Sequence, residues 1–295
     1  MSMFEPKGII VAMLTPMFPD ESINEGELRN QVNRLINSGI HGLFCLGTNG
    51  EFYALSYEEK IQVMEVVIDE NRGRLPVYAG TGCITTKETI ALTKKAKELG
   101  ADAVSIICPY YAASDQKGLY NHFKDIALAV DIPIILYNNP PRTGVHLGVE
   151  TVKKLSEIDN IVGIKDSSGN FDNILKYIEA TPDDFAVLSG NDSLILWSLL
   201  AGGKGGISGC ANIVPKELAG IYEKFIAGDL EGAKKAQASI RPIREVFKMG
   251  NPNSITKRAT ELMGHNVGPC RAPFNIDDPK IDAALREALS KFEKQ

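Results

Sequence analysis

Short apolar runs alternate with longer amphipathic segments along most of the chain. The runs are continuously apolar, which is typical of parallel strands that are covered on both faces. They occupy residues 8–14, 42–47, 76–80, 103–108, 133–137, 161–165, 185–189 and 205–208. Each run is followed by a turn and a segment of helix length. Eight such units predict an α/β fold in the form of a closed (β/α)8 barrel, the TIM barrel.

Helical spacing of apolar residues is clearest in three of the intervening segments. These cover residues 25–37, 57–71 and 87–99, and a glycine follows each of them at or just past its end. Ser56 precedes the second segment and Glu59 stands three positions later. This spacing predicts a capping box at the start of that helix.

Helical pattern continues after the eighth unit, whose helix is expected near residues 215–227. Further helices are predicted around residues 230–248, 254–263 and 280–293. We interpret residues 1–228 as the barrel and residues 229–295 as a C-terminal helical extension packed on it. An open doubly wound sheet is the alternative. It usually has fewer units, and neither GxGxxG after the first strand nor a Walker A motif is present.

Composition narrows the class of protein further. Barrels commonly reach about 250 residues as one unit, and this chain has 295, with 44% hydrophobic and 23% charged residues. A net charge of −5 argues against nucleic acid or an anionic membrane as the main partner, but allows an acidic substrate. No apolar signal segment or long apolar run occurs, so we expect a cytoplasmic enzyme. The five cysteines and four histidines are scattered and predict neither disulfides nor a metal site.

Lys165 is the most informative candidate for chemistry, because active sites of barrels lie at the C-terminal ends of the strands. It closes the apolar run that begins at residue 161. An ammonium group there loses hydration, which favours the neutral amine. Such an amine condenses with a ketone to an iminium, which yields an enamine that attacks an aldehyde. The alternative is an ordinary ion pair with Asp166 or Glu51.

Other polar residues also follow the strands. Tyr137 ends the neighbouring strand, about 4.8 Å away, and suits proton transfer with hydroxyl relays from Thr48 and Tyr111. The backbone of the 47–50 turn is able to bind a carboxylate or phosphate oxygen. Arg142 follows two prolines in a stiff loop and suits bidentate capture of a carboxylate. Alternatively, Tyr137 is only an aromatic packing residue, the 47–50 turn is a plain connection, and Arg142 is an ordinary surface arginine.

Five motifs in order resemble the dihydrodipicolinate synthase / N-acetylneuraminate lyase family of class I pyruvate-dependent aldolases, from about Gly8 to Phe274. They are GTNGE at 47–51, PYY at 109–111, YNNP at 137–140, GIKDS at 163–167 and SGND at 189–192. The resemblance implies a (β/α)8 barrel, pyruvate as first substrate and no metal or organic cofactor. It also implies a homotetramer built as a dimer of dimers.

Residue roles follow from the same resemblance. Lys165 matches the lysine that forms the imine, and Tyr137 matches the tyrosine that transfers protons. Thr48 matches the hydroxyl relay, and Tyr111 the tyrosine that reaches the site of a neighbouring subunit. The turn formed by Thr48 and Asn49 would bind the carboxylate of pyruvate. Ile207 matches the position whose backbone carbonyl faces pyruvate.

The loop after the fifth strand resembles the 4-hydroxy-tetrahydrodipicolinate synthase branch of the family, which serves lysine and diaminopimelate biosynthesis. There, the residue matched by Arg142 binds the carboxylate of aspartate 4-semialdehyde. Two positions depart from that branch. Asn49 stands where a second threonine is usual, and Phe52 where a small residue is usual. Bulky or charged residues also fill the segments that bind lysine in inhibited synthases, namely Phe52, Tyr57, Lys60 and Ile84, although Tyr110 and Glu88 remain. We therefore expect weak or absent inhibition by lysine.

The favoured function is therefore a Schiff-base-forming lyase or synthase that condenses pyruvate with aspartate 4-semialdehyde. A 2-keto-3-deoxy sugar acid aldolase or dehydratase is the first alternative, with Asn49 recognising a hydroxyl group. This first alternative includes an aldolase similar to N-acetylneuraminate lyase. A non-enzymatic pyruvate-binding protein is the alternative from another class.

Overall fold

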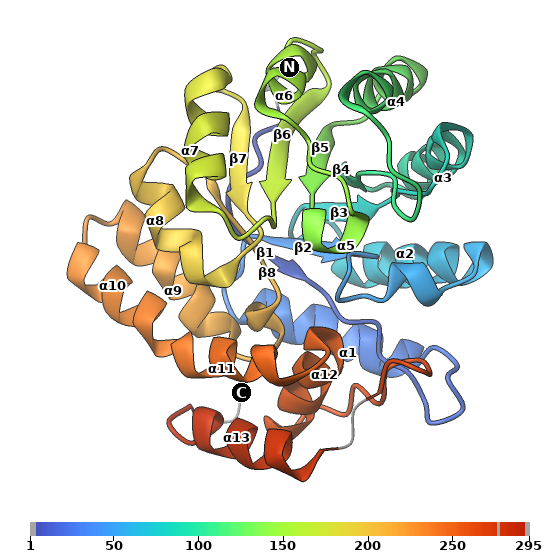
Figure 1. Ribbon diagram of the computed structural model, residues 1–295. Helices are drawn as coiled ribbons and strands as arrows, with labels where there is room; N and C mark the ends of the chain where they lie inside the picture. Colours follow the sequence, from blue (N-terminus) through green and yellow to red (C-terminus); the bar gives the residue numbers. More distant parts are fainter. Residues whose placement is uncertain (1–3, 276–277, 293–295) are drawn as a thin grey trace.

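Eight parallel strands close into a barrel in their chain order (Figure 1). The computed structural model describes residues 4–275 and 278–292. The predicted barrel is confirmed, and the ends of the predicted strands differ from the observed ones by at most two residues. The strands are β1 (Gly8–Ala12), β2 (Gly42–Cys45), β3 (Val77–Gly80), β4 (Ala103–Ile107), β5 (Ile134–Asn138), β6 (Ile161–Asp166), β7 (Ala186–Ser189) and β8 (Gly205–Ser208).

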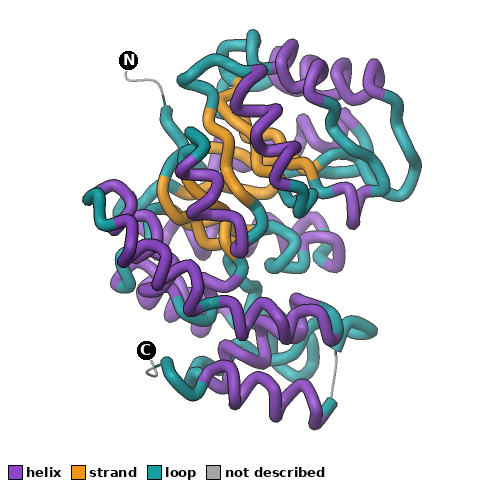
Figure 2. Tube along the Cα trace, turned by 60° about the vertical axis from the view of Figure 1, so that its left-hand side comes forward, coloured by secondary structure: helices purple, strands orange, loops and turns teal. Residues whose placement is uncertain are grey.

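Helices surround the strands on the outside of the barrel, as Figure 2 shows in purple around orange. They are α1 (Glu25–Asn37), α2 (Tyr57–Asn71), α3 (Thr86–Leu99), α4 (Gln116–Ala129), α5 (Pro140–Thr143), α6 (Val149–Leu155), α7 (Phe171–Ala180), α8 (Ile195–Leu200) and α9 (Pro215–Ile226). The predicted capping box is present at α2. Ser56 Oγ accepts from Glu59 N at 3.2 Å, and Ser56 N donates to Glu59 Oε2 at 2.7 Å.

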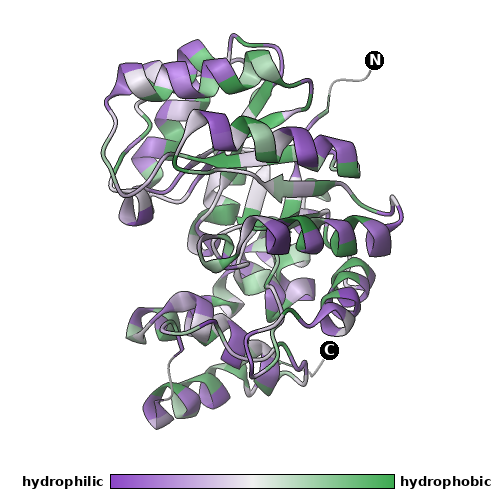
Figure 3. Cartoon of the chain, turned by 90° about the vertical axis from the view of Figure 1, so that its right-hand side faces the viewer, coloured by the Kyte–Doolittle hydropathy of each residue, from purple (hydrophilic) through white to green (hydrophobic). Residues whose placement is uncertain are grey.

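The apolar core has two layers. A large cluster lies between the strands and the helices, whose apolar stretches appear in green beside purple polar ones in Figure 3. A small cluster takes side chains from every strand and fills the inside of the barrel: Ile10, Ala12, Phe44, Tyr78, Ala103, Ile135, Val162, Leu188 and Ile207. Burial on both faces of each strand explains why the strands read as continuous apolar runs.

An irregularity in β6 determines which of its residues face inward. Ile134 of β5 pairs with Ile161, whereas the next residue, Ile135, pairs with Gly163, so β6 contains one extra residue at Val162. Strict alternation from the inward Val162 would turn Ile164 inward. The bulge shifts the alternation by one residue, and Ile164 packs outside instead. At Gly163 a Cβ atom would lie only 2.5 Å from the backbone oxygen of Ala186, so glycine is needed there.

Four more helices follow the barrel: α10 (Leu230–Ser239), α11 (Arg241–Val246), α12 (Pro252–Leu262) and α13 (Pro279–Leu289). The stretch predicted at residues 230–248 is divided into α10 and α11. Pro242 lacks a backbone N–H and cannot continue α10, but it fits the first turn of α11. Both α11 and α12 pack against α13 (Figure 1). The division into residues 1–228 and 229–295 stays a prediction. The outer ends of these two ranges, and the predicted end of the last helix at residue 293, lie outside the described residues.

None of the helices in the described part of the chain has the length and apolar character needed to cross a membrane.

Candidate active site

Lys165 lies inside the mouth of the barrel with only 4% of its surface exposed. The bulge in β6 turns its side chain inward, and it pairs in register with Tyr137 of β5. Its Nζ atom lies 4.0 Å from the centre of the Tyr137 ring and 5.1 Å from that of Phe44. The amine therefore lies against two aromatic rings at the position where barrel enzymes hold their reactive groups.

Within the described residues, Lys165 forms no ion pair with either of the two candidate carboxylates, Glu51 and Asp166. Glu51 Oε1 lies 2.7 Å from Lys257 Nζ instead. Asp166 accepts hydrogen bonds from three side chains on its own side of the strand: Asn138 at 2.7 Å, Ser168 at 2.6 Å and Asn173 at 3.2 Å. The ion-pair alternative is wrong, and the amine faces the cavity.

Tyr137 is hydrogen-bonded on both sides of its hydroxyl. Asn139 Nδ2 donates to it at 2.9 Å, and Thr48 Oγ1 lies 3.2 Å from it. Burial alone raises the pKa of the phenol, but the charge of Lys165 lowers it. Hydrogen bonds from Thr48, Ser167 and Asn139 act in the same direction, so the pKa of Tyr137 lies below its ordinary value.

A cavity of about 180 Å³ opens over the Lys165 amine. Gly190 borders it, and a Cβ atom there would lie 3.1 Å from Lys165 Cε and 2.0 Å from Ser167 Oγ, so glycine leaves room for both side chains. The structure brings six of the seven predicted site residues to this cavity: Thr48, Asn49, Tyr137, Arg142, Lys165 and Ile207.

Tyr111 is the predicted residue that does not line the cavity of its own chain. Its side chain is 98% exposed and its φ of 77° lies in the left-handed region, which is unusual for a bulky residue. The fold therefore directs this tyrosine away from the body of the subunit.

A second cavity of about 230 Å³ adjoins the first and shares Thr48, Arg142 and Asn253 with it. Four aromatic side chains contribute to its walls, namely Phe52, Tyr53, Tyr110 and Phe274. Arg142 was expected in a stiff loop and lies in the short helix α5, because two prolines at its start pre-set helical backbone angles. The arginine stands where the two cavities meet.

Several cavity residues were not predicted as site residues. Asn139 and Asp192 belong to quoted motifs at strand ends, so their position was a usable signal. Arg244 and Asn253 come from the C-terminal helical region, for which no motif was recognised. Asp192 is buried, and its Oδ2 accepts from Cys210 N at 3.2 Å and lies 3.6 Å from Arg244. Its other oxygen, Oδ1, has no hydrogen-bond partner within the described residues.

No group of three or more His, Cys, Asp or Glu side chains in residues 4–275 and 278–292 is arranged to hold a metal ion. The cavity offers an amine, a phenol, hydroxyl and amide groups, and arginines. These are groups for covalent attack, proton transfer and binding of carboxylates. A (β/α)8 barrel with this set of groups defines a lyase of the class I aldolase type.

The chain belongs to the dihydrodipicolinate synthetase family, whose model matches residues 5–292. The 4-hydroxy-tetrahydrodipicolinate synthase of Methanopyrus kandleri is 43% identical over 292 residues, which cover 98% of this chain and 97% of the relative. A solved dihydrodipicolinate synthase from Bacillus anthracis is 36% identical with a TM-score of 0.93, covering 97% of this chain and 98% of that one. The enzyme from Acinetobacter baumannii, solved as a complex with pyruvate, is 39% identical with a TM-score of 0.93 over 96% and 98%.

Proposed function

We propose that the protein condenses pyruvate with aspartate 4-semialdehyde through an imine on Lys165. The observation that carries this proposal is the buried amine of Lys165, which faces a cavity and stands 4.0 Å from the centre of the Tyr137 ring. The relatives named as synthases, and the one solved with pyruvate, support the same chemistry for this chain.

The first half of the reaction forms the imine. The neutral amine of Lys165 attacks the keto carbon of pyruvate, and the resulting carbinolamine loses water to give an iminium. Tyr137 is placed to accept the proton that the lysine ammonium must lose and to protonate the departing hydroxyl, with Thr48 as relay at 3.2 Å. The backbone of the turn at Thr48 and Asn49 binds the carboxylate, and the carbonyl of Ile207 faces the substrate.

The second half forms the carbon–carbon bond. Tyr137, deprotonated after the first half, takes a methyl proton from the iminium to give an enamine, whose carbon attacks the aldehyde carbon. Tyr137 returns that proton to the aldehyde oxygen. The amino group of the aldehyde substrate, once deprotonated, attacks the iminium carbon and displaces the Lys165 amine, which releases the product. Arg142 binds the carboxylate of the aldehyde substrate from the junction of the two cavities. Aspartate 4-semialdehyde also carries an ammonium group, for which Asp192 Oδ1 is an available acceptor.

Self-association completes the site in this proposal. The exposed side chain of Tyr111 reaches the cavity of a second copy and extends the chain of hydroxyls from Tyr137 and Thr48. A homotetramer, formed from two such dimers, is the expected assembly. Sedimentation of the wild type and of Tyr111→Phe tests the assembly, which the variant should keep. A turnover assay of the same two proteins tests the role of the hydroxyl, because the variant should lose activity.

A 2-keto-3-deoxy sugar acid aldolase is the second candidate, because the amide of Asn49 lines the cavity and suits a substrate hydroxyl. A panel of aldehydes separates the two. The synthase function predicts faster turnover of aspartate 4-semialdehyde than of sugar-derived aldehydes, with a strong dependence on Arg142. Faster turnover of a sugar-derived aldehyde, with Arg142→Ala as active as wild type on aspartate 4-semialdehyde, would contradict it.

A further inference from the structure

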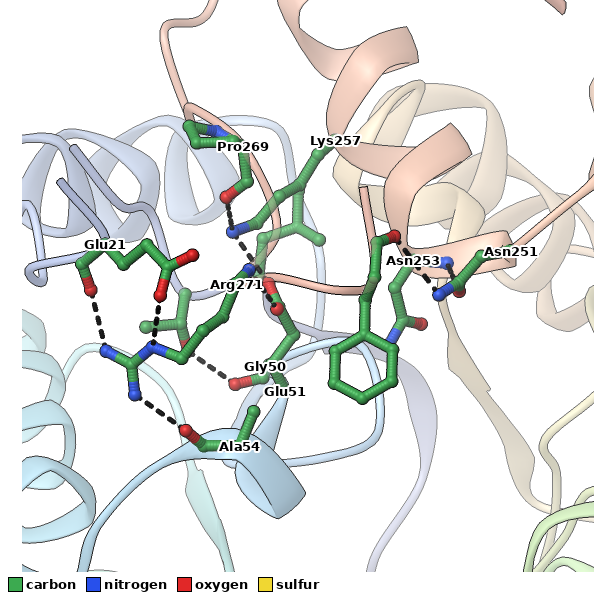
Figure 4. Close-up of polar contacts among 12 residues, drawn as sticks. Glu21, Gly50, Glu51, Ala54, Asn251, Asn253, Lys257, Pro269 and Arg271 are labelled. Atoms are coloured by element: carbon green, nitrogen blue, oxygen red, sulfur yellow. Dashed lines mark hydrogen bonds and ion pairs between the residues drawn. The ribbon is translucent and has the colours of Figure 1, made fainter. Parts of the chain in front are cut away.

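The turn that carries Thr48 and Asn49 is held mainly by the C-terminal helical region. Asn253 Nδ2 at the start of α12 donates to Thr48 O at 2.8 Å. Lys257, one turn further along α12, lies 2.7 Å from Glu51 Oε1. Figure 4 shows the Lys257 amine between Glu51 and the carbonyl of Pro269. Residues far apart in the sequence thus meet behind the proposed carboxylate-binding turn.

The ion pair between Glu51 and Lys257 is almost completely removed from solvent. Its side chains are 0% and 2% exposed. Both groups have further partners, because Glu51 Oε2 accepts from Arg271 N at 2.9 Å and Lys257 Nζ donates to Pro269 O at 2.6 Å. Buried ion pairs contribute little net stability compared with apolar residues of similar volume, but they require a defined geometry. A role in positioning therefore explains this pair better than a role in stability.

Backbone strain is concentrated in the same turn. Leu46 and Glu51 flank it with φ values of 59° and 56°, in the left-handed region that residues other than glycine avoid. Such conformations persist where the surrounding contacts over-determine them, and they cluster at functional sites. Glu51 is both a strained residue and the partner of Lys257. The ion pair from Lys257 of α12 therefore acts on Glu51, whose left-handed backbone conformation determines the path of the turn.

We propose that Lys257 is a positioning residue for the reaction. Through its ion pair with Glu51, it holds the turn at residues 48–51 so that the Thr48 hydroxyl meets Tyr137 and the turn faces pyruvate. Lys257 lines neither cavity, so it acts only through Glu51 and the turn. This inference rests on the proposed function, and it makes the C-terminal helical region part of the catalytic apparatus.

The test replaces the pair without leaving a lone buried charge, in the double variant Glu51→Gln with Lys257→Met. Replacement of both charges by neutral groups of similar size is well tolerated, so the melting temperature should stay close to that of the wild type. A small displacement of reacting groups costs about tenfold to a hundredfold in rate, and we expect a loss of that size in kcat/KM for pyruvate. The pH limb that depends on Tyr137 should move to higher pH, because its hydrogen bond with Thr48 is weakened.

Arg258→Met is the matched control. Arg258 lies next to Lys257 on α12 but pairs with Asp282 of α13, at the surface. The control removes an ion pair of the same helix without touching the turn, so its kcat/KM and pH profile should equal those of the wild type. Rates are expressed per imine-forming subunit, counted by exhaustive borohydride trapping with pyruvate, so that partial unfolding lowers the count and not the rate per site.

The outcomes separate the two proposals. If the wild type traps no pyruvate, the proposed function fails. If the wild type traps pyruvate and the double variant matches its rate per site and its pH profile, only the positioning role of Lys257 is overturned. A second variant, Glu51→Gln with Lys257→Gln, keeps a neutral donor near residue 51 and Pro269 and should give an intermediate rate per site. If neither variant folds, the pair is a requirement of folding and the positioning role is likewise overturned.

Discussion

Removal of a single hydroxyl group, in Tyr137→Phe, tests how the cavity transfers protons. The hydroxyl accepts from Asn139 at 2.9 Å and contacts Thr48 at 3.2 Å, and the Lys165 amine lies 4.0 Å from the ring centre. General acid–base catalysis contributes about 10²- to 10⁴-fold, so kcat should fall by that factor. The variant removes a hydrogen-bond partner from Asn139, Thr48 and Ser167. A buried polar group that loses its partner lowers the free energy of unfolding by about 1–3 kcal/mol. The smaller value applies where the cavity admits water, which replaces the lost partner.

Steady-state turnover and the rate of borohydride trapping with pyruvate are the two assays. Both should slow in Tyr137→Phe, while the melting temperature falls by only a few degrees. Tyr177→Phe is the matched control, because Tyr177 is also buried and donates its hydroxyl to Leu147 O, away from either cavity. The control should lose a similar amount of stability and keep its turnover. Equal turnover in both variants would refute the proton-transfer role.

The pH profile gives a second view of the same hydroxyl. A hydrogen bond donated by Thr48 stabilises the deprotonated form of Tyr137 and helps to lower its pKa. Thr48→Val removes this donor, so the pKa of Tyr137 should rise. The limb of the kcat/KM profile that depends on Tyr137 should then move to higher pH. A limb that stays in place or moves to lower pH would contradict this assignment.

Further variants test binding, regulation and packing. Arg142→Ala should raise KM for aspartate 4-semialdehyde by about tenfold to a hundredfold and leave KM for pyruvate unchanged, since a hydrogen bond to a charged group contributes about 1.5–3 kcal/mol; equal effects on both substrates would count against it. Sub-millimolar lysine should leave turnover unchanged, because the Phe52 ring packs 5.9 Å from that of Tyr110, centre to centre, in the segments where lysine is expected to bind; inhibition in a rate assay would show the opposite. Gly163→Ala should lower the free energy of unfolding by about 1–3 kcal/mol because its Cβ meets a strand backbone at 2.5 Å. In the same denaturation assay, Gly220→Ala inside α9 should raise it by about 1 kcal/mol, since nothing lies within 4 Å; equal effects of the two would disprove the packing argument.

The barrel was predictable from the sequence because burial on both faces of each strand produces continuous apolar runs. The ends of α1 and α2 were predictable for a local reason, since capping and apolar spacing act within one helix. The division of the stretch at residues 230–248 was missed, although Pro242 was a usable signal for a new helix start.

Other features depend on contacts between distant elements. Lys165 was predicted from its position at a strand end, but its inward direction depends on the bulge at Val162, which alternation alone does not predict. Gly163, directly after the bulge, packs so closely against β7 that a Cβ atom would not fit there. Asn253 and Lys257 reach the turn at Thr48 only through the packing of α12, and no local pattern encodes that contact.

The most direct measurement is reduction of the wild-type protein with borohydride in the presence of pyruvate, followed by intact mass and peptide mapping. We predict one reduced pyruvate adduct per subunit, located on Lys165 and missing in Lys165→Ala. An unmodified wild-type protein, or an adduct confined to a different lysine, would contradict it.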